Sequence, residues 1–386
     1  MVRALALVSL LTDAASEMIY PLLPVFLTTV LGASPATLGL IEGAAESTAA
    51  IVKLGSGWLS DRIGRYTPVV LVGYAIATVT RPFIGMAQSA SQVIALRLID
   101  RTGKGIRGAP RDALLAGAVD ASMRGRAFGF HRAADHLGAV IGPLIAWVLL
   151  QWVHLDLRTV FMLSAVPGVL AVLTIVLAVR DPAKPVASAA VDPAGETAVA
   201  TEPMPGQFWA VLGVLLLFTL GNSTDAFLLL RAQQLGVPVA ALPLLWAALH
   251  VVKSASSVPG GLLSDRFGRR TALLLGWALF ALVYAGFSAA VSAWQAWALF
   301  LAYGLYFGLV EGAEKALIAD MAPVARRGTA FGWYNAAMGV AALPASLLMG
   351  AVWTVRGPQQ AFLLGAVLAV VAMVLGAVIL PRRRRA

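Results

Sequence analysis

Apolar residues dominate this chain in runs of about 20 residues, separated by short polar connections, a pattern typical of membrane helices. The runs are rich in Leu, Ala and Val and do not alternate, so they do not match the short alternating strands of a membrane barrel. Helices satisfy their own backbone in lipid, and we therefore expect an all-α membrane protein with twelve transmembrane helices. Their expected ranges are 4–30, 36–59, 68–88, 91–117, 127–152, 157–179, 207–231, 238–262, 271–291, 293–319, 329–352 and 358–380.

Composition supports the same class of protein. Hydrophobic residues make up 59% of the 386 residues and charged residues only 12%, which leaves too little polar surface to coat a water-soluble globule. Cysteine is absent, which excludes disulfides and thiolate metal sites. The first apolar run carries Asp13 and Glu17 in its interior, so we expect a retained helix rather than a cleaved signal peptide.

The basic residues lie mostly on one side of this topology. By the positive-inside rule, that side is cytoplasmic, and it includes both termini and the central connection. The net charge of +10 is then a signal of membrane orientation, and a nucleic-acid partner is not expected. The opposite connections carry little beyond Arg158 and Arg356.

Two sequence patterns occur twice. GWLSDRIGR at 57–65 returns as GLLSDRFGRR at 261–270, and RGRAFGF at 124–130 returns as RGTAFGW at 327–333. The two offsets, 204 and 203 residues, nearly agree, which indicates a duplicated chain. We expect two pseudo-symmetric six-helix bundles at 1–180 and 207–386, joined by a cytoplasmic linker at 181–206 that is rich in Pro, Ala and small polar residues.

On these motifs the chain resembles the major facilitator superfamily (MFS) over essentially its whole length. In that family the pattern G-x-L-x-D-R-x-G-R-R joins helices 2 and 3, and again helices 8 and 9. The first copy here has Tyr66 where the last arginine is usual, and the second copy is complete. RTGKGIRGA at 101–109 is similar to the family's R-x-x-Q-G-x-G pattern, with Lys104 and Arg107 as replacements.

The fifth helix carries a further similarity. Gly129, Gly138, Gly142 and Pro143 resemble the motif associated with antiporters of the superfamily, although Ala146 and Trp147 replace its final glycine pair. The resemblance, to a poorly characterised permease branch, implies the twelve-helix MFS fold, a small-molecule substrate, function as a monomer in the lipid bilayer, no cofactor and no enzymatic activity. It also implies that helices 1, 4, 7 and 10 line a central cavity.

The repeated loop motif is a candidate gate, because its charges can pair across the cytoplasmic side and release as the halves move. The alternative is that they only anchor the loop and enforce topology. The gating candidates in the two loops are Asp61, Arg62, Arg65, Asp265, Arg266, Arg269 and Arg270.

Carboxylates and a histidine inside the membrane are candidates for proton coupling. Asp13 and Glu17 lie one turn apart on one face of helix 1, near Tyr20, and such charges are costly in lipid unless they face water or a cation. His131 and Asp135 lie one turn apart on helix 5 and match a proton relay. The alternatives are permanent pairing of the helix 1 carboxylates with a basic residue of helix 4 or 5, and a buried, satisfied His–Asp pair.

Helix 4 carries an unusual basic face. Asp100, Lys104, Arg107 and Arg111 follow helical spacing, with Arg101 to one side. Two interpretations stay open: a gate or packing network from Arg107 and Arg111 to the helix 10 residues Glu311 and Glu314, or a site that binds a substrate carboxylate or phosphate. On helix 2, Glu42 and Glu46 lie on nearly the same face as Lys53, so we expect an internal salt bridge.

Other polar and aromatic positions are candidates for the substrate cavity, with ordinary helix packing or interfacial anchoring as the alternative. They are Arg132, Asn222, Asp225, Trp333, Tyr334 and Asn335. A metal site from His131, His136, Asp13 and Glu17 is chemically possible, but with four histidines, no cysteine and no His-rich tract we predict no bound metal.

The sequence therefore predicts a secondary active transporter working by alternating access. Our first hypothesis is a proton-coupled efflux antiporter of a small organic molecule in the inner membrane of a bacterium. The alternatives are proton-coupled uptake of an organic anion, efflux of a divalent metal, and a membrane sensor or scaffold that retains a carrier fold. An enzyme is disfavoured because no metal-ligand spacing, nucleophile elbow or phosphate loop occurs.

Overall fold

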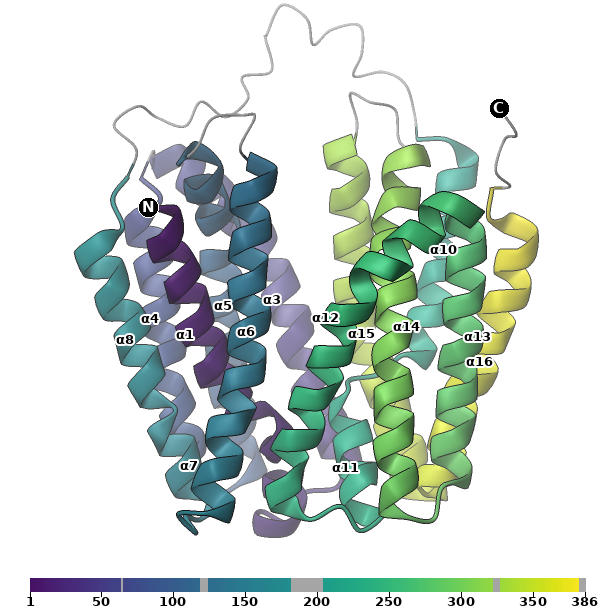
Figure 1. The fold of residues 1–386 in the computed structure, drawn as a ribbon, viewed down its shortest axis with the longest axis horizontal. Coiled ribbons are helices and arrows are strands. Elements are labelled where there is room, and N and C mark those ends of the chain that lie inside the picture. The colour runs from purple at the N-terminus through teal and green to yellow at the C-terminus, as the bar shows by residue number, and fades with distance from the viewer. Residues whose placement is uncertain (64, 119–123, 182–203, 322–326, 382–386) are drawn as a thin grey trace, which may run out of the picture. The chain divides into compact units, whose positions relative to one another are not determined.

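The computed structural model describes residues 1–63, 65–118, 124–181, 204–321 and 327–381, and the regular secondary structure of these residues is entirely helical (Figure 1). The helices are α1 (Val2–Glu17), η1 (Tyr20–Leu22), α2 (Leu23–Val25), η2 (Phe26–Val30), α3 (Pro35–Ile63), α4 (Thr67–Ile84), α5 (Ala90–Gly117), α6 (Arg124–Gln151), α7 (Leu157–Leu163), α8 (Ala165–Ala178), α10 (Gly206–Gly221), α11 (Ala226–Gln234), η4 (Val239–Ala241), α12 (Leu242–Phe267), α13 (Arg269–Ala289), α14 (Ala293–Met321), α15 (Arg327–Arg356) and α16 (Pro358–Ile379).

Each of the twelve predicted spans coincides with one helix or with consecutive helices of the described chain. Nine spans there are long and apolar enough to cross a membrane. The remaining three cover 2–30, 35–63 and 90–117, and these carry the intramembrane charges predicted for helices 1, 2 and 4. The spans that depart most from a simple apolar helix are therefore the ones with candidate chemistry.

The chain divides into two compact units. Unit 1 comprises Met1–Ala33, Ala44–Ala190 and Pro238–Ala247, and unit 2 comprises Ser34–Gly43, Val191–Val237 and Ala248–Ala386. The boundaries fall inside α3 and α12. The first turns of α3 belong to unit 2 and the rest of α3 to unit 1, whereas the first turns of α12 belong to unit 1 and the rest of α12 to unit 2. Residues 182–203, most of the predicted linker, lie outside the described residues, and the bundle boundaries at 180 and 207 stay predictions.

Glycines bring the helices of unit 1 into close contact. A Cβ atom at Gly142 of α6 would overlap the backbone carbonyl of Ala14 on α1, and one at Gly138 would overlap that of Leu10. Between α4 and α5, a Cβ at Gly73 would lie 2.7 Å from the carbonyl oxygen of Gly103. The helix 5 glycines predicted as an antiporter-like motif thus let α6 pack directly on α1.

Aromatic side chains fill the interior of unit 2. The ring centroid of Phe218 lies 5.0 Å from that of Trp277 and 5.0 Å from that of Phe280, and Tyr303 stacks on Tyr306 at 5.6 Å. Trp277, Phe280 and Tyr303 are fully buried. Such offset and edge contacts add to the packing that holds helices together where lipid supplies no hydrophobic driving force.

Two spans are broken at polar residues. In the first, α1 ends at Glu17, and Pro21 and Pro24 cannot donate backbone hydrogen bonds to the preceding turn, so short irregular helices follow. In the seventh span, α10 ends at Gly221 and α11 begins at Ala226, with the polar segment 222–225 between them. Breaks of this kind expose backbone groups and place side chains in the interior of transporters.

Candidate functional site

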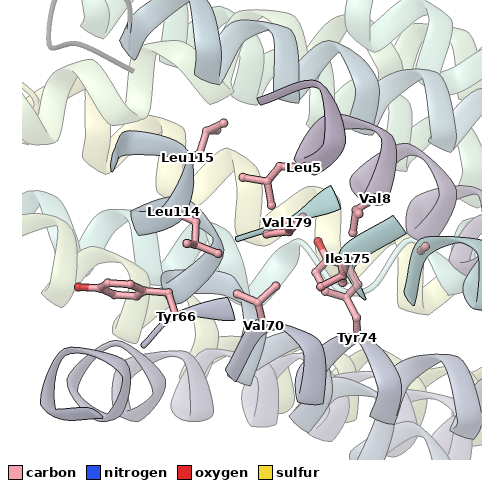
Figure 2. Close-up of a cluster of buried hydrophobic side chains, with 10 residues drawn as sticks. Leu5, Val8, Tyr66, Val70, Tyr74, Leu114, Leu115, Ile175 and Val179 are labelled. Carbon is pink, nitrogen blue, oxygen red and sulfur yellow. The ribbon is translucent and has the colours of Figure 1, made fainter. Parts of the chain in front are cut away.

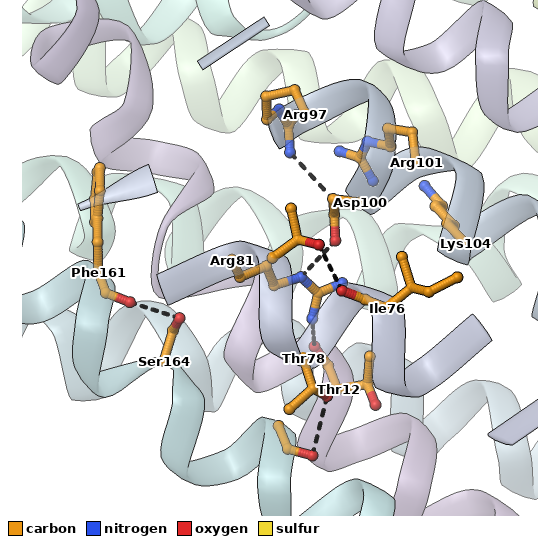
Figure 3. Close-up of polar contacts among 12 residues, drawn as sticks. Thr12, Ile76, Thr78, Arg81, Arg97, Asp100, Arg101, Lys104, Phe161 and Ser164 are labelled. Carbon is orange, nitrogen blue, oxygen red and sulfur yellow. Dashed lines mark hydrogen bonds and ion pairs between the residues drawn. The ribbon is translucent and has the colours of Figure 1, made fainter. Parts of the chain in front are cut away.

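A fully buried ion-pair network joins three helices of unit 1. Nε of Arg81 on α4 donates to Oδ1 of Asp100 on α5 at 2.9 Å, and the same guanidinium donates to the backbone oxygen of Thr12 on α1 at 3.0 Å (Figure 3). Nη1 of Arg97 lies 3.7 Å from the other carboxylate oxygen of Asp100. All three side chains are at most 5% exposed, so the cost of burying these charges is offset mainly within the network.

A second group of charges is half exposed. Oε1 of Glu46 on α3 lies 3.4 Å from Nη2 of Arg101 and 3.8 Å from Nζ of Lys104, both on α5. The side chains of Glu46 and Lys104 are 44% and 46% exposed, whereas that of Arg101 is 6% exposed. Glu46 therefore pairs with α5 in addition to any salt bridge within its own helix, which is the only pairing that we predicted for helix 2.

The C-terminal residues of the basic face of α5 also have partners within unit 1. The guanidinium carbon of Arg107 lies 4.2 Å above the ring centroid of Tyr74 on α4, a cation–π contact. Arg111 donates from Nη2 to the carboxylate of Asp112 at 2.8 Å. The predicted network from Arg107 and Arg111 to Glu311 and Glu314 would join the two units and stays a prediction.

Asp135 on α6 collects several polar groups. The hydroxyl of Ser9 on α1 donates to its Oδ1, Nδ1 of His131 lies 3.5 Å from the same oxygen, and Nη1 of Arg132 lies 3.6 Å from Oδ2. Asp13 on α1 interacts electrostatically with Asp135 and, with opposite sign, with the cations of α5. The structure thus brings three of the four proton-coupling candidates, Asp13, His131 and Asp135, to the contact between α1 and α6.

Glu17, the fourth candidate, has an aromatic partner. Nε1 of Trp246 donates to Oε2 of Glu17 at 2.7 Å, and the Trp246 ring lies 5.0 Å from that of Tyr20. Trp246 stands in the first turns of α12 that belong to unit 1. Arg101 and Lys104 of α5 also act electrostatically on this carboxylate.

Unit 2 holds its carboxylates with tyrosine hydroxyls. At the break between α10 and α11, the hydroxyl of Tyr303 donates to Oδ1 of Asp225 at 2.7 Å, and Nδ2 of Asn222 donates to the hydroxyl of Tyr306 at 3.3 Å. Glu314 lies on the C-terminal half of α14, and the hydroxyl of Tyr334 on α15 donates to its Oε2 at 2.8 Å.

The remaining unit 2 candidates have local contacts. Glu311 pairs with Lys315 at 3.3 Å, and Asn335 donates to the backbone oxygen of Phe331 at 2.8 Å. Trp333 is 51% exposed and packs on Trp209 with ring centroids 5.4 Å apart. Nζ of Lys253 on α12 lies 3.8 Å from the ring centroid of Phe307 on α14.

The loop motif is described in part. The side chains of Asp61, Arg62 and Asp265 lie outside the described part of the structure, and so do the surroundings of Gly129. Arg65 is exposed, and Arg266 lies 5.3 Å from the ring of Phe267. Nε of Arg269 lies 3.6 Å from Asp320 on α14.

Sequence reasoning missed Arg81, Ser9, Trp246 and the tyrosine partners Tyr303 and Tyr306. Arg81 had a readable signal, because it is a charged residue inside the apolar run 68–88. The others had none, since serine, tryptophan and tyrosine are ordinary residues of membrane helices. Among the described residues, no three histidine or acidic side chains are grouped so as to hold a metal ion.

Comparison with known proteins identifies the class of this chain. The sequence model of the Major Facilitator Superfamily matches residues 5–311 and 226–386, so the chain belongs to that superfamily. An uncharacterized MFS-type transporter of Methanocaldococcus jannaschii is 29% identical over 384 residues, covering 96% of this chain and 92% of the relative. The quinolone resistance protein NorA of Staphylococcus aureus strain MRSA252 is 25% identical over 167 residues, 43% of this chain and 42% of NorA.

Solved structures agree on the fold. The crystal structure of the nucleoside transporter NupG superposes with a TM-score of 0.79 at 14% identity, covering 99% of this chain and 99% of that one. The predicted fold class, an all-α membrane protein with the twelve-helix MFS fold, is therefore confirmed. The chain is a membrane transporter of small molecules and not an enzyme, as the sequence indicated.

Proposed function

We propose that this transporter couples the export of a small organic molecule to the entry of protons. The observation that carries the proposal is the contact of α6 with α1. Gly138 of the antiporter-like motif packs against Leu10 and Asp13, with a Cβ at Gly138 only 3.1 Å from the Cβ of Asp13, and Asp135 stands one turn earlier on α6. The motif glycine thus helps to set the distance between two carboxyl groups inside the membrane.

Two carboxyl groups placed this way disfavour simultaneous ionisation, which makes one of them a site for a transported proton. A proton taken up there removes a charge that interacts with the cations of α5, and the energy of the outward-open and inward-open states then changes by different amounts. Substrate and proton that compete for this polar region give exchange rather than joint transport. The similarity to a quinolone resistance protein supports the outward direction.

The test is proton flux in everted vesicles with an acidic interior. Addition of candidate organic cations and organic anions is expected to release protons with one class, and Asp13→Asn or Asp135→Asn is expected to abolish the release. The matched control is Asp112→Asn, since this carboxylate pairs with its neighbour Arg111 and is 42% exposed. Release that survives both Asp13→Asn and Asp135→Asn would refute the assignment of the proton site.

The second candidate function is proton-coupled uptake of an organic anion, and the arrangement of Glu46 favours it. The buried guanidinium of Arg101 and the half-exposed ammonium of Lys104 lie 3.4 and 3.8 Å from Oε1 of Glu46, distances longer than those of a tight ion pair. A substrate carboxylate has the same chemistry as Glu46 and can take its place. Accumulation of radiolabelled organic anions in right-side-out vesicles, increased in affinity by Glu46→Gln and reduced by Arg101→Gln, would support uptake. Absence of accumulation, with proton release in everted vesicles, would exclude it.

We also propose that the protein works as a monomer in the inner membrane of a bacterium, with both termini cytoplasmic. The excess of basic residues on one side of the topology supports the orientation. Single cysteines introduced near each terminus are expected to react with an impermeant maleimide in everted vesicles and not in intact cells. The reverse labelling pattern would show the opposite orientation.

A further inference from the structure

The two copies of the loop motif differ at one residue close to the start of the following helix. Arg65, Tyr66 and Thr67 of the first copy align with Arg269, Arg270 and Thr271 of the second. A tyrosine thus stands in one half where an arginine stands in the other. The structure shows how each half secures this position.

In the second half, the arginine ties the start of α13 to the end of α16 through a hydrogen bond. Nη2 of Arg270, in the first turn of α13, donates to the backbone oxygen of Ala377 near the end of α16. The last carbonyl groups of a helix lack partners within the helix and carry partial negative charge, so a guanidinium stabilises them. The start of α13 and the end of α16 are joined in this way.

In the first half, the side chain of Tyr66 is packed in an apolar cluster. It is 6% exposed among Leu5, Val70, Leu114 and Val179 of unit 1 (Figure 2). A tyrosine has no guanidinium, so the start of α4 lacks the donor with which Arg270 holds the end of α16.

Asp181 ties the start of α4 to the end of α8 instead, and it does so as a hydrogen-bond acceptor rather than as a donor. Its Oδ1 accepts hydrogen bonds from the backbone N–H of Tyr66 at 3.0 Å, the backbone N–H of Thr67 at 2.8 Å and the hydroxyl of Thr67 at 3.0 Å. Asp181 follows closely on the end of α8, and its carboxylate lies at the start of α4, where unpartnered N–H groups and the helix dipole favour negative charge. In the sequence of the second half, Pro381 and Arg382 follow α16 and offer no acceptor side chain.

We infer that Asp181 is the positioning residue of the first loop motif. By accepting hydrogen bonds it holds the start of α4 to the end of α8, as Arg270 holds the start of α13 to the end of α16 by donating one. The loop enters α4 through Arg65, so Asp181 holds the loop to the end of α8. Its loss lets the start of α4 separate from α8, which slows the change of conformation without altering the substrate site. This last consequence rests on the proposed transport function, whereas the structural tie does not.

The absence of native cysteine permits a direct test. Val69 lies buried in the first turn of α4, so a Val69→Cys protein reacts with maleimide only when this turn detaches. We expect Asp181→Ala to increase the labelling rate by roughly two- to thirtyfold, the effect of losing a capping side chain. Asp181→Asn is expected to label like the parent, because a single oxygen accepts all three hydrogen bonds and an amide retains it.

Two controls sharpen the result. Arg180→Ala, which removes an exposed neighbour that donates to the backbone oxygen of Val176 on α8, is expected to leave the rate unchanged. In the second half, Arg270→Ala is expected to increase labelling of Ala272→Cys, and Arg270→Lys to increase it less. Equal labelling of the parent, Asp181→Ala and Asp181→Asn proteins would overturn the inference, as would equal acceleration by both substitutions at Asp181.

Transport supplies the second readout. Asp181→Ala is expected to reduce the maximal rate and to leave the substrate concentration at half-maximal rate unchanged, and Asp181→Asn is expected to restore the rate. Accelerated labelling together with an unchanged maximal rate would refute the positioning role and leave only a structural tie. Absence of transport in the parent protein would count against the proposed function, not against the tie, because labelling measures the tie without any substrate.

Discussion

Two carboxylates of unit 1 and two of unit 2 are held in different ways. In unit 1, Arg81 and Arg97 pair with Asp100, and Arg101 and Lys104 pair with Glu46. In unit 2, Tyr303 donates to Asp225 and Tyr334 donates to Glu314. The buried Arg231 of unit 2 donates to the backbone oxygens of Phe287 and Ala290, so it stabilises the end of α13.

The difference has a chemical consequence. A carboxylate held by guanidinium groups leaves buried positive charge behind when it takes up a proton, so the pair resists any change of protonation. A carboxyl group facing a phenol can keep a hydrogen bond in either state, because the hydroxyl both donates and accepts. The network of Arg81, Arg97 and Asp100 is thus suited to holding helices together. The carboxyl groups that tyrosines bind in unit 2 can keep their hydrogen bond in either protonation state.

The largest expected effect follows from breaking the buried network of unit 1. Arg81→Ala removes the shorter of the two described ion pairs of Asp100, which stays buried, and we expect a loss of about 3–5 kcal/mol in stability. The measurement is the thermal unfolding midpoint of purified protein in detergent, followed by tryptophan fluorescence. Arg97→Ala, whose contact is 3.7 Å, is the matched control and should cost less. Equal losses would show that distance in this network does not decide its energy.

A smaller effect is expected from the tyrosine bond of unit 2. Tyr303→Phe removes one hydrogen bond to a charged group and should cost about 1.5–3 kcal/mol. Tyr306→Phe removes a bond to the neutral amide of Asn222 and should cost about 1 kcal/mol, which makes it the control in the same unfolding assay. A loss on Tyr303→Phe as large as that on Arg81→Ala would remove the contrast between the units.

The ammonium group of Lys253 in unit 2 is expected to contribute less again. Lys253→Met keeps the length of the side chain and removes only the ammonium over Phe307, with a cost of roughly 0.5–2 kcal/mol. Phe307→Leu should lower stability by a similar amount, and the double variant should cost less than the sum of both. Strict additivity of the two unfolding midpoints would show that the ring and the ammonium do not interact.

The smallest effect on stability is expected at the half-exposed pair of unit 1. Glu46→Gln should change stability by less than about 1 kcal/mol, because the side chain of Glu46 is 44% exposed. Its effect should appear in substrate affinity instead, as the anion hypothesis requires. A marked drop in the unfolding midpoint would place Glu46 with Asp100 as a structural residue.

The fold was predictable because each of its determinants is local. Apolar runs of spanning length, the bias of basic residues and the repeat of the Asp-Arg-x-Gly-Arg motif all lie along the chain, and each predicted span was found within the described residues. The repeat placed the second loop correctly between α12 and α13.

The site was predictable only as a set of residues. Helical spacing identified Asp100 and Lys104 as neighbours on α5, but their partners Arg81 and Glu46 come from α4 and α3. Helical periodicity reports which side chains share a face and not which helix faces them, so we predicted the salt bridge within helix 2 and missed the pair with helix 4.

The sequence by itself determined the class of protein, its spans and the residues too costly to place in lipid without a purpose, because the bilayer penalises every unsatisfied polar group in the same way. Tertiary structure decided which carboxylate meets a guanidinium, which meets a phenol, and that Asp181 takes the place of an arginine at the start of α4. These pairings depend on how closely glycines let neighbouring helices approach and on which side chains then face each other, and both are properties of the packed molecule.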